Sequence, residues 1–306
     1  MPAYNRVEWL RLCLLSVLAQ THRQFRLLVV DDGSEPPLAE HNLLIDIIND
    51  ERVSLLVKPN GGPASARNLG LDQAEGDYIM MLDSDDILET SAIETLLAAL
   101  RVSGADFAAG PWANFSVDVN DRVLVSPHPI YRDSYANCVA CGWVPGSVMI
   151  KNDGTTRYNE LRMPWEALEF YLDYLAVGRL AVYIDSITVN MRQHLSYDRL
   201  TIAHDHFEPF KTGAFFAEKK AALARAELLN FERSASLDSR MLSEILVLLR
   251  ERRVHEARML FQRVSWSLID QYHYMRFGSF AWFSRRFGFE LGSRSFVMVS
   301  RLIGGA

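Results

Sequence analysis

The acidic tetrapeptide at residues 83–86 (Asp-Ser-Asp-Asp) is the strongest chemical signal in the sequence, and it directly follows the apolar run 78–82. Carboxylates held this close raise one another's pKa unless a positive group neutralises them. Oxygen ligands without nearby thiolates suit Mg²⁺ or Mn²⁺, which bind through one or two carboxylates while a substrate diphosphate completes the coordination. The tetrapeptide therefore predicts a divalent-cation site; the alternative is a solvated turn in which Asp85 or Asp86 caps the next helix.

A second acidic turn and a glycine loop accompany this tetrapeptide. Residues 31–34 (Asp-Asp-Gly-Ser) end the apolar run 25–30, and the loop 60–70 carries two adjacent glycines followed by Arg67. Together these groups could frame a nucleotide, with a carboxylate for a base N–H, the arginine for phosphate oxygens and the metal across the diphosphate. The glycines follow neither the Walker nor the dinucleotide pattern, so a P-loop is excluded.

The elements that must position these groups alternate between two periodicities. Helical spacing of apolar residues covers 8–20, 38–49 and 64–74, and short apolar runs cover 25–30, 53–57 and 78–82. This order predicts an α/β fold with a mixed, mainly parallel sheet flanked by helices. Both acidic turns then lie at the carboxyl ends of strands, where open α/β sheets bind ligands.

The chain changes character near residue 205. Before it, we expect further strands at 107–110, 123–126, 147–150 and 180–184, and a helix at 165–177. Beyond it, strand signals vanish and amphipathic helices are expected at 215–231 and 237–252, the second capped by Ser236 or Asp238. The sequence thus predicts one domain over 1–204 and a helical C-terminal region over 205–306.

Composition narrows the class of protein. The 306 residues carry 32 Lys plus Arg against 38 Asp plus Glu, a formal net charge of −6 that argues against nucleic acid as a partner. Three cysteines are too few for a disulfide framework, and the lone Cys138-x-x-Cys141 lacks the second ligand pair of a structural zinc site. No apolar run approaches the ~18–20 residues that span a bilayer, and the start lacks a signal peptide, so the expected location is cytoplasmic.

The last 41 residues, 266–306, hold ten aromatic residues and five arginines against two acids. Such a segment could lie on an anionic membrane surface, at the inner face of the membrane. The alternative is a helical subdomain whose aromatic residues pack on the sheet or on a second subunit, because glycines interrupt any single amphipathic helix.

Five successive motifs resemble those of family-2 inverting glycosyltransferases with the GT-A fold. They are 2–5 (Pro-Ala-Tyr-Asn), 16–21 (Ser-Val-Leu-Ala-Gln-Thr), 29–34 (Val-Val-Asp-Asp-Gly-Ser), 66–70 (Ala-Arg-Asn-Leu-Gly) and 82–86 (Leu-Asp-Ser-Asp-Asp). The resemblance implies a metal-dependent enzyme that moves a sugar from a nucleotide diphosphate sugar, with UDP as the expected nucleotide. The acceptor would be a hydroxyl of a saccharide or a lipid-linked molecule, as in polysaccharide and cell-envelope biosynthesis.

The resemblance also implies roles for single residues of the donor site. Tyr4 would flank the nucleotide base, and Asp32 would accept a hydrogen bond from that base. Arg67 would lie near the diphosphate or brace the acidic tetrapeptide. Asp83 would contact the ribose or the metal.

The metal, Mg²⁺ or Mn²⁺, would have Asp85 as its principal ligand, joined by Asp83. Asp86 would brace the site or cap a helix. In the downstream sequence Arg-Gln-His, His194 would approach the metal or the diphosphate. The alternative for His194 is a hydrogen-bonded structural histidine.

The acceptor side departs from the family's pattern. Family members carry Glu-Asp at the start of a helix, with the Asp as general base, but here Glu166 is followed by Ala167. Glu166 is the best substitute, because it lies at the helix start beside Trp165; its alternative is a purely electrostatic role. Glu169 is the second choice, being three residues further along the same face. The loop 143–147 would shape the acceptor pocket or form a structural turn.

The family's first strand is expected to be missing, because Met1 sits where that strand would end. Either the true start lies upstream, or the sheet has unpaired backbone groups and holds Tyr4 poorly. Together with Ala167, this keeps open a non-catalytic nucleotide-sugar-binding protein. A nucleotidyltransferase would also pair carboxylates with a nucleotide, but it would need a basic glycine-rich loop near the start, which is not seen.

Overall fold

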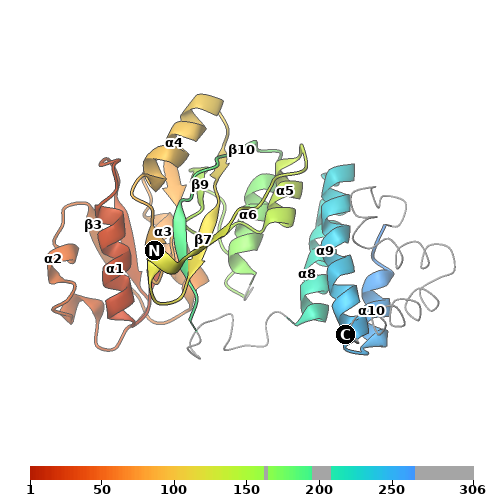
Figure 1. Cartoon of the computed structure of the whole chain (residues 1–306), viewed down its shortest axis with the longest axis horizontal. Helices are drawn as coiled ribbons and strands as arrows, with labels where there is room; N and C mark the ends of the chain where they lie inside the picture. Colours follow the sequence, from red (N-terminus) through yellow and green to blue (C-terminus); the bar gives the residue numbers. More distant parts are fainter. Residues whose placement is uncertain (162–164, 195–207, 266–306) are drawn as a thin grey trace. The chain divides into compact units, whose positions relative to one another are not determined.

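Three stretches of the chain, residues 1–161, 165–194 and 208–265, are described by a computed structural model (Figure 1). The chain divides into two units. One comprises residues 1–129 and 141–199, and the other comprises 130–140 and 200–306. The first unit holds all the strands described, and the described part of the second is built from helices.

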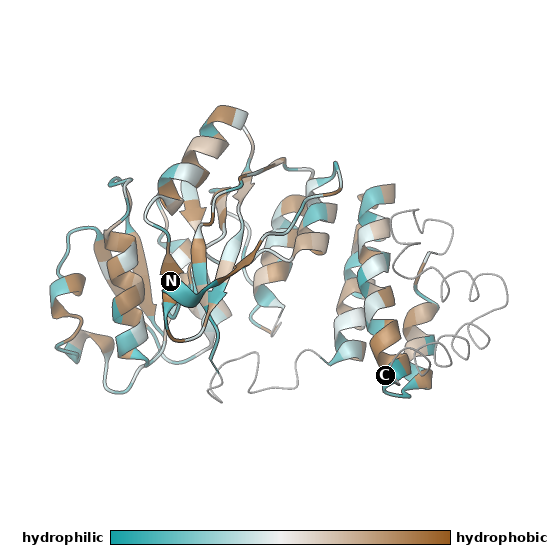
Figure 2. Ribbon diagram, in the orientation of Figure 1, coloured by the Kyte–Doolittle hydropathy of each residue, from teal (hydrophilic) through white to brown (hydrophobic). Residues whose placement is uncertain are grey.

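The first sheet of unit 1 consists of three parallel strands, β1 (Pro2–Ala3), β2 (Leu27–Asp31) and β3 (Val53–Val57). The helix α1 (Val7–Leu18) lies between β1 and β2 in the sequence, and α3 (Pro63–Asp72) follows β3 and packs on β1 and β2. Hydrophobic residues concentrate on α1 and the strands, whereas the connecting turns are hydrophilic (Figure 2). The helices predicted at 8–20 and 64–74 and the strands predicted at 25–30 and 53–57 are therefore confirmed.

The strand that was expected to be missing is present in a short form. Two residues form β1, which pairs with β2: Val30 N donates to Met1 O (2.9 Å) and Asp32 N donates to Ala3 O (2.8 Å). These bonds satisfy the edge of β2 that the missing strand would have left open. A strand as short as β1 could not be predicted, because two residues are too few to show an apolar period.

The prediction of a single helix at 38–49 is wrong. Two short helices take its place, η1 (Leu38–Glu40) and α2 (Ile45–Ile48). His41 adopts an extended backbone with ψ 114°, so the first helix ends there. Leu44, between the two helices, is fully buried, which explains why the apolar spacing looked continuous.

Two further sheets complete unit 1. In one sheet the strand order is β10 (Ala181–Tyr183), β6 (Phe107–Ala109), β9 (Val148–Lys151) and β4 (Tyr78–Met80). In the other sheet the order is β5 (Ile87–Leu88), β11 (Val189–Arg192), β7 (Trp112–Phe115) and β8 (Val123–Val125). Both contain parallel and antiparallel pairs, so the predicted mixed α/β fold is confirmed. The sequence missed β5, β7 and β11. Of these, β5 has only two residues, too few to show an apolar period.

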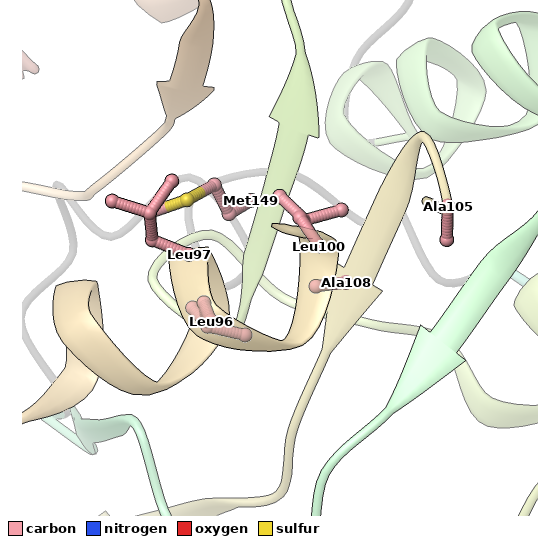
Figure 3. Close-up of a cluster of buried hydrophobic side chains, with 6 residues drawn as sticks. All are labelled: Leu96, Leu97, Leu100, Ala105, Ala108 and Met149. Carbon is pink, nitrogen blue, oxygen red and sulfur yellow. The ribbon is translucent and has the colours of Figure 1, made fainter. Parts of the chain in front are cut away.

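The helix α4 (Ala92–Ser103) covers the sheet that contains β6 and β9 (Figure 3). Three leucines of α4 project from one face, because their spacing of one, three and four residues follows the helical turn. They pack with small and flexible side chains of β6, of β9 and of the turn before β6; the cluster is Leu96, Leu97, Leu100, Ala105, Ala108 and Met149. This core fixes β9 and β6, and through β9 it fixes β4, which leads to the acidic tetrapeptide.

Gly146 packs against the segment that ends in the acidic tetrapeptide, and its N–H donates to Met81 O (2.6 Å). Its φ is +80°, and an added Cβ would lie 2.7 Å from Val189 Cγ2 and 3.0 Å from Leu82 Cδ1. We therefore expect Gly146→Ala to lower the free energy of unfolding by about 2 to 5 kcal/mol, through left-handed backbone strain and overpacking, as measured by denaturant unfolding. Gly154→Ala is the control, because its φ is +67° but nothing lies within 4 Å. Equal losses in both variants would contradict the packing contribution.

Unit 2 contains the helices α8 (Pro209–Arg225), α9 (Phe231–Arg250) and α10 (Val254–Phe261), and the segment 130–140 contributes most of α5 (Ser134–Cys141). The two long helices begin earlier than predicted. Glu208 caps α8 by accepting from Phe210 N, and Asn230 caps α9 by accepting from Arg233 N. Such caps satisfy the orphan N–H groups of the first turn.

The prediction that Ser236 or Asp238 caps the second helix is wrong. Both residues are buried inside α9, where the Asp238 carboxylate pairs with Lys220 Nζ of α8 (2.6 Å). A buried carboxylate needs a partner of this kind. Because Lys220 lies on a different helix, the sequence around Asp238 could not show whether Asp238 forms an ion pair or caps a helix.

No helix in the described parts of the chain is long and apolar enough to cross a membrane. The basic and aromatic segment 266–306 lies outside the described residues, so its two interpretations stay predictions. All three cysteines are free thiols.

Candidate functional site

A buried carboxylate holds the glycine loop that follows β3. Asp32 is 3% exposed; its Oδ1 accepts from Lys58 Nζ (2.7 Å) and Gly61 N (3.0 Å), and its Oδ2 accepts from Gly62 N (2.7 Å). Charge-assisted bonds of this kind are roughly twice as strong as neutral ones. Lys58 was not among the residues expected at the site, although a lysine directly after an apolar strand, at the same sheet edge as Asp32, was a usable signal.

The neighbouring Asp31 has a different role. Its Oδ1 accepts from Ser34 N (2.8 Å) and its Oδ2 accepts from Leu38 N (3.0 Å), and the residue is 1% exposed. Both oxygens therefore close the turn after β2. Of the two adjacent acids, only Asp32 contacts the glycine loop.

Residues 4–6 join the two acidic turns. Asn5 N donates to Ser34 Oγ (2.8 Å), and the next side chain, Arg6, directs Nη1 to Asp85 Oδ2 (3.3 Å). Asn5 and Arg6 both have positive φ, 53° and 52°, a conformation that costs about 1 to 2 kcal/mol per L residue. Backbone strain of this kind clusters at functional sites. Tyr4 is 50% exposed, so its ring is accessible to a planar ligand.

The acids of the tetrapeptide diverge in their contacts. Asp86 is buried, and its Oδ1 accepts from Arg192 N (2.9 Å), so it braces β11. Arg192 Nε in turn donates to the backbone oxygen of Asp85 (3.0 Å). The Asp85 side chain instead meets His194, with Oδ2 and Nε2 3.1 Å apart. The structure thus joins Asp85 and His194, and it places Asp86 outside their contact.

Trp9 packs against the groups that surround Asp85. Its ring lies 4.6 Å from the His194 ring, and the guanidinium groups of Arg6 and Arg192 lie 5.6 and 5.4 Å from its centroid. These distances fall within the range of cation–π interactions. In the sequence, Trp9 was indistinguishable from the other apolar residues of its helix.

Arg67 lies between carboxylates from two parts of the chain. Its Nη2 donates to Asp83 Oδ1 (2.6 Å) and its Nη1 donates to Glu166 Oε1 (3.4 Å), while its guanidinium stacks 5.2 Å from the Tyr158 ring centroid. Burial by itself lowers the pKa of Arg67, but the charges of Asp83, Tyr158 and Glu166 outweigh this effect and raise the pKa above its ordinary value. Arg67 therefore stays charged and braces the acidic tetrapeptide, one of the two roles expected for it.

Glu166 opens the helix α6 (Glu166–Ala176) and is 7% exposed. Its Oε1 pairs with Arg67, whereas its Oε2 is buried without a hydrogen-bond partner among the described residues. Burial raises the pKa of Glu166, and the nearby Arg67 charge opposes this rise. Glu169, on the same helix, is also buried, whereas Ala167 is half-buried. A glutamate with a raised pKa is better matched to proton transfer near neutral pH than an ordinary one.

A divalent cation would find few protein ligands among these groups. Within the described stretches, no three His, Cys, Asp or Glu side chains converge in a geometry that could hold a metal. Asp85 and His194 offer two ligands 3.1 Å apart, and Asp83 Oδ1 is engaged by Arg67. Two protein ligands suffice for a cation that takes its other positions from a diphosphate and water. A cation at Asp85 would therefore need substrate and water oxygens to complete its coordination, and it would share Asp85 Oδ2 with Arg6.

The loop 143–147 has the contacts of a structural turn. Trp143 is 3% exposed and stacks on Tyr183, with 5.6 Å between ring centroids, and Ser147 Oγ donates to Val144 O (2.7 Å). Residues 163 and 164, which precede Trp165 on the expected acceptor side, lie outside the described residues.

Comparison with known sequences gives matches over the first three quarters of the chain. Residues 1–223 match the model of a family described as glycosyl transferase family 2. A Rickettsia conorii protein described as an uncharacterised glycosyltransferase is 43% identical over 108 residues, which are 35% of this chain and 18% of that protein. A Haemophilus influenzae protein with the same description is 38% identical over 128 residues, 41% of this chain and 50% of that protein. These matches span at most half of either relative's length.

Solved structures are similar over nearly the whole chain. Residues 1–349 of S. aureus TarS in complex with UDP-GlcNAc give a TM-score of 0.71 at 16% identity, with 98% of this chain and 90% of that chain covered. The complex of the same TarS fragment with UDP gives 0.70 at 14% identity over the same shares of both chains. At this level of identity the likeness concerns the fold. The fold class implied by the sequence motifs is confirmed.

Proposed function

The chain belongs to glycosyl transferase family 2, and on that premise we propose that it transfers a sugar from a nucleotide diphosphate sugar to an acceptor hydroxyl. One observation carries this proposal: residues 4–6 tie both acidic turns together. Asn5 bonds Ser34 of the first turn, and Arg6 bonds Asp85 of the second. The groups proposed to bind the base and the metal, which are distant in the sequence, would thereby lie in one site.

The donor is proposed to be a UDP-sugar. Two TarS structures of the same fold hold UDP-GlcNAc and UDP, which supports this nucleotide. In this chain the accessible ring of Tyr4 would flank the base. Asp32 and Lys58 would offer a hydrogen-bond acceptor beside a donor, which is complementary to the N–H and C=O groups on the edge of uracil. Asp83, oriented by Arg67, would contact the ribose or the metal.

A divalent cation, Mg²⁺ or Mn²⁺, is proposed to be held by Asp85 and His194, with Asp83 as a further ligand. When bound, it would neutralise negative charge on the departing diphosphate. Arg6, next to Asp85, would add a second positive group for the phosphate oxygens. Asp86 and Arg192 would keep Asp85 in place through the backbone contacts described above.

Glu166 is proposed as the general base. In a single in-line step the acceptor oxygen would form a bond to the anomeric carbon as the bond from that carbon to the diphosphate oxygen breaks. The acceptor proton would pass to Glu166, and the bonding electron pair would pass to the diphosphate. Attack from the face opposite the diphosphate would invert the configuration of the anomeric carbon. Glu169 is the second candidate for this role, because it lies one turn further along α6 and is also buried.

A non-catalytic nucleotide-sugar-binding protein is the second candidate function. One observation favours it: Glu166 is buried and ion-paired to Arg67, and the next residue is Ala167, which cannot take a proton. The proposed acceptor remains a saccharide or a lipid-linked molecule. Peripheral membrane contact through residues 266–306, and the absence of a nucleic-acid partner, remain proposals from composition.

Calorimetric titration of UDP, GDP and dTDP, with Mn²⁺ and again with EDTA, tests the donor site. We expect UDP to bind with metal at least tenfold more tightly than without it, since the cation bridges carboxylate and diphosphate. Slow hydrolysis of the UDP-sugar would then separate an enzyme from a pure binder. Tight binding of all three nucleotides without metal, or of none with metal, would overturn the proposed donor site.

A further inference from the structure

Asn68 is the neighbour of Arg67 in the motif 66–70, and the proposed chemistry does not use it. Its side-chain amide nevertheless clamps the backbone of Tyr158: Oδ1 accepts from Tyr158 N (2.8 Å) and Nδ2 donates to Tyr158 O (3.0 Å). Nδ2 also donates to Glu160 Oε1 (2.9 Å). One side chain of α3 therefore holds a loop that lies 90 residues further along the sequence.

The ring of Tyr158 connects this clamp to Arg67 and to α6. It is 4% exposed and stacks face to face on Phe170, with 4.3 Å between centroids and an interplanar angle of 8°. The Arg67 guanidinium lies over the same ring, 5.2 Å from its centroid. Phe170 follows Glu166 by one helical turn, so its side chain and that of Glu166 lie on the same side of α6. The contacts form a closed cycle from α3 through the loop to α6 and back through Arg67.

This cycle matters because Arg67 is held by few hydrogen bonds of its own. Its two terminal nitrogens donate to Asp83 and Glu166, and its buried Nε has no partner among the described residues. The side chain has several rotatable bonds, so its orientation depends on the surface against which it packs. The Tyr158 ring is that surface.

We propose that Asn68 and Tyr158 are positioning residues, which hold the Arg67 guanidinium where one cation faces both Asp83 and Glu166. Asp83 belongs to the donor side of the site and Glu166 to the acceptor side, so the pair would set the distance between the two halves. This inference rests on the proposed function, and it assigns no contact with substrate to either residue.

The first test is the rate of sugar transfer. Asn68→Ala is expected to lower kcat by about 10- to 100-fold and to leave the Kd for the nucleotide within about threefold, because a small displacement of reacting groups is costly. Tyr158→Leu should behave alike. Tyr158→Phe should retain most of the activity, since the Tyr158 hydroxyl has no hydrogen-bond partner among the described residues and the ring remains.

Asn152→Ala is the matched control. The Asn152 amide also clamps backbone groups, donating to Ala74 O (3.2 Å) and Gly76 O (3.0 Å) and accepting from Gly154 N (3.0 Å). Its loss should lower the Tm as Asn68→Ala does, because each variant loses a backbone clamp. Only Asn68→Ala should lower kcat. Equal kcat in the two variants, or a Tyr158→Phe variant as slow as Tyr158→Leu, would overturn the proposal.

The second test does not depend on activity. A double-mutant cycle on unfolding compares the effect of Glu166→Gln in the wild-type and Asn68→Ala backgrounds. If Asn68 orients Arg67, the effect of Glu166→Gln should be at least halved in the Asn68→Ala background, and it should be unchanged in Asn152→Ala. Additive effects with Asn68→Ala would overturn the positioning role. A wild-type protein that binds and cleaves no donor would remove the proposed function, while the cycle would still decide the positioning role.

Discussion

Asp85→Asn is expected to lower sugar transfer by about 10²- to 10⁴-fold, because it removes the charge that would hold the cation at the diphosphate. Loss of a metal's charge stabilisation is worth several kcal/mol, and each 1.4 kcal/mol is about tenfold in rate. The amide keeps nearly the same shape, so it can still form a hydrogen bond with His194 Nε2, which lies 3.1 Å from Asp85 Oδ2 in the wild type. We also expect the metal-dependent part of nucleotide binding to disappear in calorimetric titration.

Asp86→Asn is the matched control for this variant. It lies in the same tetrapeptide and is buried, but its Oδ1 accepts from Arg192 N, and an asparagine oxygen can accept the same bond. We expect transfer within about tenfold of the wild type. The hydrogen bond to Arg192 N is retained, and the loss of the charge weakens it by only about 1 kcal/mol. If Asp86→Asn lost metal-dependent binding while Asp85→Asn kept it, the assignment of the metal ligand would be wrong.

Glu166→Gln is expected to lower kcat by about 10²- to 10⁴-fold, the usual contribution of a general base. Nucleotide binding should change little, because Glu166 meets the donor side only through Arg67. The measurement is kcat with saturating donor and acceptor, alongside the Tm to confirm folding. Glu169→Gln is the control, a second buried glutamate on the same helix. A larger loss in Glu169→Gln would assign the base to Glu169 instead.

The pH dependence of kcat follows from the environment of Glu166. A general base acts in its deprotonated form, so the rate should fall as the pH drops through the pKa of the base. Burial raises the pKa of Glu166, against the opposing charge of Arg67, so this fall should occur above the ordinary glutamate pKa of about 4.3. The fall should be absent from the residual activity of Glu166→Gln. A profile with the same acid limb in both proteins would exclude Glu166 as the base.

Local patterns in the sequence predicted much of the fold. The runs 25–30, 53–57 and 78–82 became strands because apolar stretches flanked by polar turns bury in a sheet whatever their partners are. The elements that were missed, such as β1 and β5, have only two residues each and depend on pairing with a neighbouring strand. Their formation is therefore a property of the assembled sheet.

The sequence by itself determined which residue types gather at the candidate site: carboxylates after two strands, a glycine loop and an arginine in the next helix. The tertiary structure decided their individual contacts. Asp31 and Asp86 became braces, whereas Asp85 met His194, 109 positions away, and Arg67 reached Glu166 across 99 positions. Side chains adjacent in a turn have nearly identical local patterns, and they differ only in the direction in which the folded backbone points them. Contacts between distant segments, which the chain makes only on folding, therefore separated the residues of the site from the residues that support it.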